Sequence, residues 1–307
     1  MPFRASSLVY DICSDMPFLP FSIASCAKIN LGLRILRRRS DGYHDIESIF
    51  VAIDLSDVLK VEPADTLSVD CRPEVTLEPD QNIVFRAASL YARCFPNDEC
   101  GAKITVSKRI PTGAGLGGGS GDAAATLLAM AHINGRLGDP QTIALLEPLA
   151  ASCGSDVPFF LHAGLALVTG RGEHVTPINA TFPWTVLVVC PGIHVNTATA
   201  YSTLGITGEY PSPRLREHLL QAIASKRLDP FVFANDFERS VYPQHPTLKE
   251  IKDRISRSGA SYVSMSGSGS SVFGLYEDAT NAAAAAAELA DLEPYICAPV
   301  TASFRPI

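Results

Sequence analysis

Residues 113–125 read GAGLGGGSGDAAA, and six of the first nine residues are glycine. Glycine permits main-chain paths that other residues avoid, so backbone N–H groups can surround an anion closely. From residue 122 the sequence favours a helix as far as residue 133, with Ser120 expected at its N-cap. A helix N-terminus attracts negative charge. The stretch therefore predicts a phosphate-binding loop, because a flexible linker, the alternative, would not run straight into an amphipathic helix.

Two common phosphate-loop motifs compete for these glycines, and neither fits. Residues 113–118 satisfy GxGxxG, but a dinucleotide-binding fold needs a second strand before its ribose-binding acid, and the chain leaves no room for one before Asp139. A Walker loop needs a lysine where this chain has Gly119. Without that lysine the loop needs a cation from elsewhere. Lys28 and Lys108 are the candidates.

Length and composition indicate an ordinary globular protein of one or two domains, with 307 residues, 47% of them hydrophobic and 19% charged. No apolar run reaches the roughly 20 residues of a membrane helix, and residues 1–15 predict a loose extension rather than a signal peptide, with Met16 as an alternative start. A net charge of -7 argues against nucleic acid as a partner. Eight scattered cysteines without CxxC spacing predict reduced, mostly buried thiols in a cytoplasmic protein, and no metal site.

Apolar periodicity predicts alternating strands and helices. In residues 26–36 it predicts a half-buried strand that carries Lys28, Asn30 and Arg34 on one face and Leu33 among the apolar residues of the other. Further strands are expected over 49–55, 58–61, 103–107, 163–169, 185–190 and within 262–276, and helices over 82–94, 122–133, 142–151, 215–225, 247–256 and 281–292. The pattern restarts near residue 182, which predicts domains over 16–180 and 181–307.

Several segments, taken in chain order, resemble the GHMP kinases. They are PTGAGLGGGS at 111–120 together with AKINL at 27–31, DGYH at 41–44, KRIP at 108–111, GSDVPF at 154–159, GRGE at 170–173 and SGSG at 266–269. Within that family they are most similar to the kinases of a cytidine diphosphate sugar alcohol in the non-mevalonate route to isoprenoids. The resemblance spans about residues 22–276.

This resemblance implies an α+β fold of two domains, the first like ribosomal protein S5 and the second ferredoxin-like. It implies transfer of the γ-phosphate of ATP, accompanied by Mg²⁺, to the 2-hydroxyl of the small-molecule substrate, with no direct metal ligand evident in the sequence. Two alternatives are a GHMP kinase for another small alcohol, such as homoserine or mevalonate, and a non-catalytic nucleotide-binding protein. The DGYH segment argues against the first, and intact Lys28 and Asp156 argue against the second.

The resemblance also implies the site residues. Lys28 and Asp156 become the catalytic pair, in which Asp156 would accept the proton of the hydroxyl late in phosphoryl transfer. The substrate contacts become Asn30, Tyr43, His44 and Tyr201. The ATP contacts become Asn82, Ile83, Lys108, Pro111, Gly113, Gly115, Leu116, Gly117, Gly118, Gly119 and Ser120.

Four further positions have expectations of their own. Asp156 precedes Val-Pro, which is also typical of a helix N-cap, and the two roles are compatible. Asn235 and Asp236 match a family segment without an assigned role. Gly121 stands where most relatives carry a second serine. Because helical backbone angles accept a Cβ, we expect Gly121→Ser to be harmless.

Overall fold

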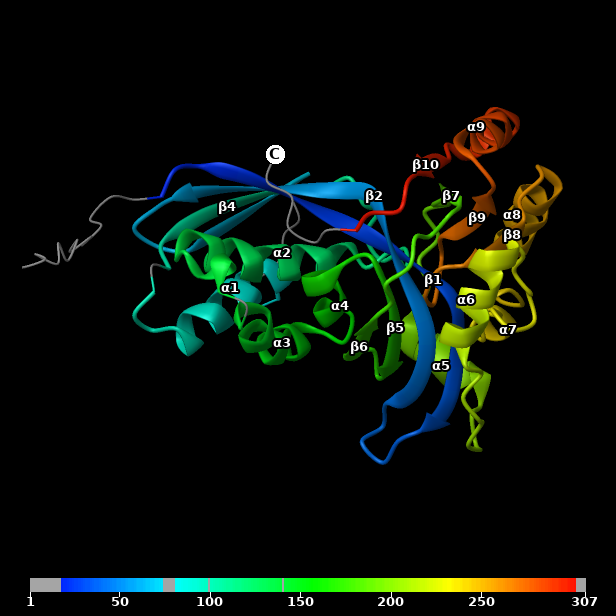
Figure 1. The fold of residues 1–307 in the computed structure, drawn as a ribbon, viewed down its shortest axis with the longest axis horizontal. Helices are drawn as coiled ribbons and strands as arrows, with labels where there is room; N and C mark the ends of the chain where they lie inside the picture. The colour runs from blue at the N-terminus through cyan, green and yellow to red at the C-terminus, as the bar shows by residue number, and fades with distance from the viewer. Residues whose placement is uncertain (1–17, 74–80, 99, 140, 302–307) are drawn as a thin grey trace, which may run out of the picture.

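The computed structural model describes residues 18–73, 81–98, 100–139 and 141–301, so the predicted extension over 1–15 lies outside the described residues. Figure 1 shows two sheets, one with helices packed beneath it and a second with its own helices at the opposite end of the molecule. The first sheet has six strands and the second has four. This arrangement confirms the α+β prediction.

The six-stranded sheet is built on a long antiparallel hairpin. Its strands are β1 (Phe21–Arg38), β2 (His44–Pro63), β3 (Ser68–Arg72), β4 (Ala102–Ser107), β5 (Leu165–Gly170) and β6 (His174–Pro177). They follow the order β3-β4-β2-β5-β6, with β1 paired to β2. The two strands predicted over 49–55 and 58–61 are one strand, because residues 56 and 57 between them also pair with β1, and a register shift at residues 54 and 55 does not end the pairing.

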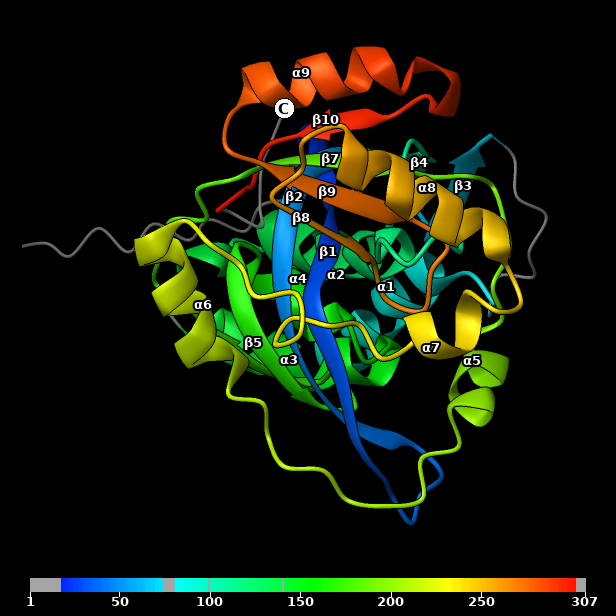
Figure 2. The same ribbon diagram turned by 90° about the vertical axis from the view of Figure 1, so that its right-hand side faces the viewer.

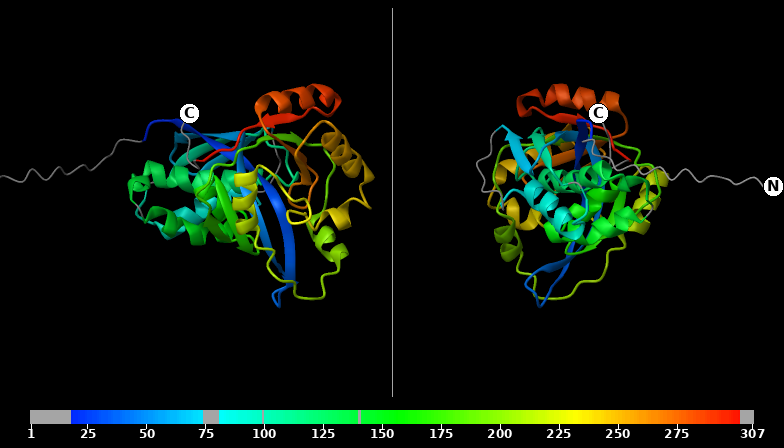
Figure 3. Two further views of the ribbon diagram at one scale, coloured as in Figure 1. Left: turned by 45° about the vertical axis from the view of Figure 1, so that its right-hand side comes forward. Right: turned by 90° about the vertical axis from the view of Figure 1, so that its left-hand side faces the viewer.

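The glycine loop leads directly into a central helix. The helices that cover the six-stranded sheet are α1 (Ile83–Cys94), α2 (Gly118–Ile133), α3 (Thr142–Cys153) and α4 (Val157–His162) (Figure 3). Helix α2 is buried from Gly121 to Ala131. Its N-cap is Gly117, whose φ of 71° glycine adopts without strain. The helix therefore begins four residues before the predicted start, and Ser120 lies in its first turn rather than at the N-cap.

The four-stranded sheet is antiparallel, in the order β10 (Tyr295–Cys297), β7 (Thr185–Val189), β9 (Val272–Tyr276) and β8 (Tyr262–Met265). Helices α8 (Pro246–Arg257) and α9 (Ala279–Glu288) pack together against one face (Figure 2). The remaining helices are α5 (Thr197–Leu204), α6 (Leu215–Ser225) and α7 (Glu238–Val241), with 3₁₀ turns at Arg136–Gly138 and Ala290–Leu292. The helix predicted over 281–292 thus ends at Glu288.

The other face of this sheet packs against the hairpin of the first sheet. Val186 and Val188 of β7 share a buried apolar cluster with Ile29 and Leu31 of β1. The two halves of the chain therefore share a core, and the division at residues 180 and 181 stays a prediction.

Strand β1 changes its facing at Gly32. The register with β2 shifts between Leu31 and Leu33, and Gly32 has a φ of 70°. As a result Leu33 lines the same cavity as Lys28 and Asn30, whereas Arg34 pairs with Asp236 at 3.4 Å. The predicted face with Lys28, Asn30 and Arg34 is wrong beyond this point, because one extra residue in a strand reverses every later side chain.

The structure describes seven of the eight cysteines and places no disulfide between them, while Cys13 lies outside the described residues. Cys26, Cys153 and Cys297 are buried, while Cys94 is exposed and the other three are partly exposed. The prediction of reduced thiols stays a prediction, but the prediction that most are buried is wrong. In the part of the chain that the structure describes, no helix is both long and apolar enough to cross a bilayer.

Candidate active site

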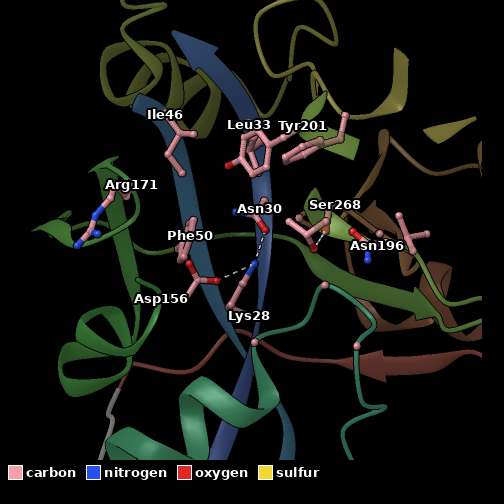
Figure 4. A pocket seen from close by; sticks show the side chains of 18 of the residues that line it. Lys28, Asn30, Leu33, Ile46, Phe50, Asp156, Arg171, Asn196, Tyr201 and Ser268 are labelled. Atoms are coloured by element: carbon pink, nitrogen blue, oxygen red, sulfur yellow. Dashed lines mark hydrogen bonds and ion pairs between the residues drawn. The ribbon is translucent and has the colours of Figure 1, made fainter. Parts of the chain in front are cut away.

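A cavity of about 380 Å³, here called the central cavity, opens where the two sheets meet. Strands β1 and β2 form one wall, the glycine loop forms another, and residues 194–197 and 267–269 come from the second half of the chain. Figure 4 shows Lys28, Asn30 and Asp156 facing one another inside it. The cavity therefore combines side chains that the sequence predicts as catalytic with one predicted to contact the substrate.

Lys28 and Asp156 form an ion pair, with 3.5 Å between Lys28 Nζ and Asp156 Oδ2. Lys28 also donates to Asn30 Oδ1 at 2.5 Å, and Asn30 Nδ2 donates to Ser48 Oγ at 3.0 Å. Burial lowers the pKa of Lys28, and the Asp156 carboxylate opposes that shift. Lys28 has a side chain only 4% exposed, whereas that of Asp156 is 32% exposed. The ammonium is thus held rigidly while the carboxylate remains open to the cavity.

The direction of the Asp156 side chain is related to the place of this residue between two helices. Helix α3 ends at Cys153, and Asp156 is the residue before α4. Its side chain makes no capping hydrogen bond and reaches Lys28 instead. Asp156 therefore stands at the predicted N-cap position of α4, although its side chain makes no capping bond there.

The glycine loop borders a second pocket of about 410 Å³, here called the nucleotide pocket. Every residue predicted to contact ATP lines it, from Asn82 and Ile83 to Ser120. Asn82 also caps α1, because its Oδ1 accepts from the Val84 N–H at 3.0 Å. Gly113, Gly115 and Gly117 line both this pocket and the central cavity. The glycines therefore form the boundary between the two.

The SGSG segment supports the glycine loop. Ser266 Oγ donates to the Gly115 carbonyl at 2.9 Å, and the Ser271 N–H donates to the Ala114 carbonyl at 3.0 Å. A Cβ at Gly115 would lie 2.1 Å from the Ser266 carbonyl oxygen, and the φ of Gly115 is 79°. Only glycine fits this close approach. The segment between β8 and β9 is thus a brace for the loop as well as a hairpin turn.

Asn235 and Asp236 connect β1 to that brace. Asn235 Nδ2 donates to the carbonyls of Met265 and Gly267 at 2.7 and 2.8 Å. Asp236 Oδ2 accepts from the Ile35 N–H at 2.9 Å. These bonds are buried and join β1 to the SGSG segment, so the contacts of both residues are structural.

A third pocket of about 610 Å³, the outer pocket, continues from the central cavity on the side away from the glycine loop. The rings of His44 and Tyr201 stack with 4.5 Å between centroids and 11° between planes. The guanidinium of Arg171 lies 4.8 Å from the Tyr43 ring centroid. Burial and nearby Arg38 lower the pKa of His44, while burial, with the charge of Asp156, raises the pKa of Tyr201 to about 12. The pocket thus offers a cluster of uncharged aromatic rings beside two cations, Arg38 and Arg171.

Comparison with known proteins shows which family has this architecture. The GHMP kinases N terminal domain matches residues 82–164, and the GHMP kinases C terminal domain matches residues 218–293. The 4-diphosphocytidyl-2-C-methyl-D-erythritol kinase of Chlorobaculum tepidum is 42% identical over 268 residues, which cover 87% of this chain and 92% of that protein. That of Solibacter usitatus is 40% identical and covers 83% and 81%.

The chain belongs to this family of GHMP kinases. A crystal structure of 4-(cytidine 5'-diphospho)-2C-methyl-D-erythritol kinase superposes with a TM-score of 0.75 at 35% identity, over 90% of this chain and 98% of that one. A homoserine kinase from Cytophaga hutchinsonii superposes with a TM-score of 0.68 at 18% identity, over 95% and 98%, which shows the shared fold alone. The predicted family and two-part fold are confirmed.

The packing around Gly121 contradicts a prediction from the sequence. A Cβ there would lie 2.7 Å from Ser25 Oγ and 2.8 Å from the Cys26 carbonyl oxygen. The backbone angles accept a side chain, but strand β1 passes too close to leave space for one. The expectation that Gly121→Ser is harmless is therefore wrong.

Several cavity residues had no prediction from the sequence. Arg171 lies within the GRGE segment, and Gly267, Ser268 and Gly269 lie within the SGSG segment, so each had a motif as its signal. The others follow from tertiary contact and are Leu33, Ile46, Phe50, His194, Val195, Asn196, Thr197 and Phe237. Ser268 and Thr197 bond to each other through their hydroxyls at 2.7 Å, although they are 71 positions apart. No local pattern could have paired them.

Proposed function

We propose that this GHMP kinase transfers the γ-phosphate of ATP to the 2-hydroxyl of 4-diphosphocytidyl-2-C-methyl-D-erythritol. The observation that carries the proposal is the order of the three pockets. The central cavity with Lys28 and Asp156 lies between the nucleotide pocket and the outer pocket, and shares lining residues with each. A kinase needs this order, because the reacting hydroxyl must meet the γ-phosphate between the two binding sites.

ATP would occupy the nucleotide pocket. Backbone N–H groups of the glycine loop and the N-terminus of α2 favour its phosphates. Asn82 and Ile83 line the same pocket, and the base would lie against them. Lys28, and not Lys108, lines the central cavity and would offset charge on the phosphoryl oxygens during transfer.

Asp156 would act on the acceptor hydroxyl. Its carboxylate is partly exposed to the central cavity and 3.5 Å from Lys28 Nζ. A tertiary alcohol is a far weaker acid than a carboxylic acid, so early deprotonation would be steeply uphill. We infer that Asp156 orients the hydroxyl and accepts its proton late, as the oxygen–phosphorus bond forms. Asn30, held by Ser48, would position the sugar alcohol beside it.

The cytidine would bind in the outer pocket. Aromatic faces favour offset stacking with another ring, and Tyr43, His44 and Tyr201 present such faces there. Arg171 lines both the outer pocket and the central cavity. A substrate that reaches from one to the other would pass its guanidinium.

Mg²⁺ would enter with ATP. It commonly keeps several waters and binds through one or two carboxylates together with substrate phosphates. Among the described residues, no group of three or more His, Cys, Asp or Glu side chains could hold a metal ion. Asp156 is the carboxylate that lines the central cavity, so it fits such a site as a single protein ligand. The free thiols support a cytoplasmic location.

The deciding experiment measures ADP release from ATP and Mg²⁺ with three alcohols: the cytidyl substrate, homoserine and mevalonate. We expect release that depends on the cytidyl substrate. Release with homoserine or mevalonate instead would replace the proposed substrate. ATP binding without turnover on any of the three would contradict the enzyme assignment.

A further inference from the structure

A cluster of three charged side chains lies beside the glycine loop, away from the central cavity. Lys108 Nζ is 2.5 Å from Asp57 Oδ2 and 2.7 Å from Asp122 Oδ2. The side chain of Asp57 is fully buried, that of Asp122 is 4% exposed, and that of Lys108 is 16% exposed. Both carboxylates thus engage the ammonium in a nearly closed environment.

Asp57 also holds the chain that leads into the glycine loop. Its Oδ1 accepts from the backbone N–H groups of Arg109 and Ile110 at 2.5 and 2.8 Å. Asp57 follows the register shift of the β1–β2 pair, across from Ser25. Asp122 belongs to α2, immediately after the loop. The cluster therefore joins the segment before the loop, strand β2 and the helix after the loop.

Without Lys108 the cluster would hold two carboxylates and no cation. Asp122 Oδ1 is buried, and the Ser25 hydroxyl is the other group that favours the ionised carboxylate besides Lys108. Burial raises the pKa of Asp122 to about 6, and Lys108 acts against that shift. Removal of one partner from a buried ion pair is costly because the remaining charge is uncompensated. Here two carboxylates would remain, beside a loop whose expected ligand is itself an anion.

We propose that Lys108 is a positioning residue, whose ammonium serves nucleotide binding as the counter-charge of Asp57 and Asp122 and not as a ligand of the nucleotide. The cluster of Lys108, Asp57 and Asp122 holds the two ends of the glycine loop at the separation that phosphate binding requires. This inference deepens the proposed function, since it takes ATP as the occupant of the nucleotide pocket. It differs from the sequence expectation, in which Lys108 is a candidate cation for the glycine loop and a direct ATP contact.

The test compares binding of the non-hydrolysable ATP analogue AMP-PNP, with Mg²⁺, by calorimetry. The variants are Lys108→Met and the double variant Lys108→Met/Asp122→Asn, in which the lost positive charge is matched by a lost negative charge. The control is Lys103→Met on β4, which removes an exposed lysine paired with Asp70 at 3.2 Å. Melting temperatures report on folding. Because no alcohol is present, an error in the proposed alcohol substrate would not affect the result.

We expect Lys108→Met to weaken AMP-PNP binding by about tenfold or more, since it breaks a buried charge pair. The double variant should recover most of that loss, as coupled neighbours do. Lys103→Met should bind like the wild type. If the double variant binds as weakly as Lys108→Met, the ammonium is a direct ligand and the proposal is overturned.

Folding failure is also informative. If Lys108→Met does not fold and the double variant does, charge compensation is supported. If neither folds, the ammonium does more than balance charge, and the proposal is again overturned. Wild-type protein that bound no AMP-PNP would contradict the assignment of the nucleotide pocket itself.

Discussion

Two lysine–carboxylate sites flank the glycine loop, and they differ in how closed they are. In the central cavity Lys28 meets Asp156, whose side chain is 32% exposed. In the cluster beside the loop Lys108 meets Asp57 and Asp122, which are 0% and 4% exposed. A partly exposed carboxylate can exchange its partner for a substrate hydroxyl, whereas two buried carboxylates cannot leave theirs. Under our two proposals, the same residue types serve chemistry at one site and loop geometry at the other.

The largest expected effect tests the open site. Asp156→Asn keeps the shape of the side chain and removes the proton acceptor. We expect turnover to fall by roughly 10² to 10⁴, the usual contribution of general-base catalysis, with AMP-PNP affinity unchanged. Steady-state kinetics and calorimetry measure the two quantities. An Asn variant within about threefold of wild-type turnover would remove the distinction between the two sites.

The outer pocket should show a smaller effect confined to one substrate. Tyr201→Ala removes one partner of the His44 stack. We expect KM for the cytidyl substrate to rise by about three- to tenfold, the range of one aromatic contact, while KM for ATP stays constant. Methylerythritol 4-phosphate, which lacks the cytidine, should react poorly with the wild type. Equal kcat/KM for the two alcohols would contradict the assignment of the outer pocket.

A substitution at Gly121, where α2 packs against β1, should lower the stability of the protein. Gly121→Ser places a Cβ 2.8 Å from the Cys26 carbonyl oxygen, so β1 or α2 must shift. Overpacking typically costs about 1 to 3 kcal/mol, which lowers the melting temperature by several degrees in a protein of this size. Gly119→Ser is the matched control, because its Cβ would have only Ile83 nearby, at 3.7 Å. An unchanged melting temperature for Gly121→Ser would show that the helix moves freely away from β1.

The smallest effect is expected where a lysine pair is exposed on both sides. Lys103 and Asp70 are 48% and 55% exposed. Such surface pairs contribute about 0 to 1 kcal/mol, so Lys103→Met should shift the urea midpoint of unfolding only slightly. A shift as large as that of Lys108→Met would mean that burial does not separate the two kinds of pair.

Local sequence patterns were sufficient for most elements and for the loop. Helix α1 begins at Ile83, one residue after the predicted start at Asn82, and α6 spans the predicted residues 215–225. The glycine run and the short segments that resemble the family contain the predicted ATP contacts, which line the nucleotide pocket, and Lys28, Asn30 and Asp156, which line the central cavity. These features depend on periodicity, capping and main-chain freedom, which act between residues close in the chain.

The sequence by itself therefore determined the family, the α+β class and the identity of Lys28 and Asp156 as neighbours in a kinase site. Only the tertiary structure decided that Lys108 is enclosed by two carboxylates, that Leu33 turns into the cavity, and that Gly121 has no room for a side chain. Each of these depends on a partner distant in sequence: Asp57 for Lys108, the β2 register for Leu33, and Ser25 and Cys26 for Gly121. Close packing settles which distant atoms share a space, and neither composition nor spacing records that.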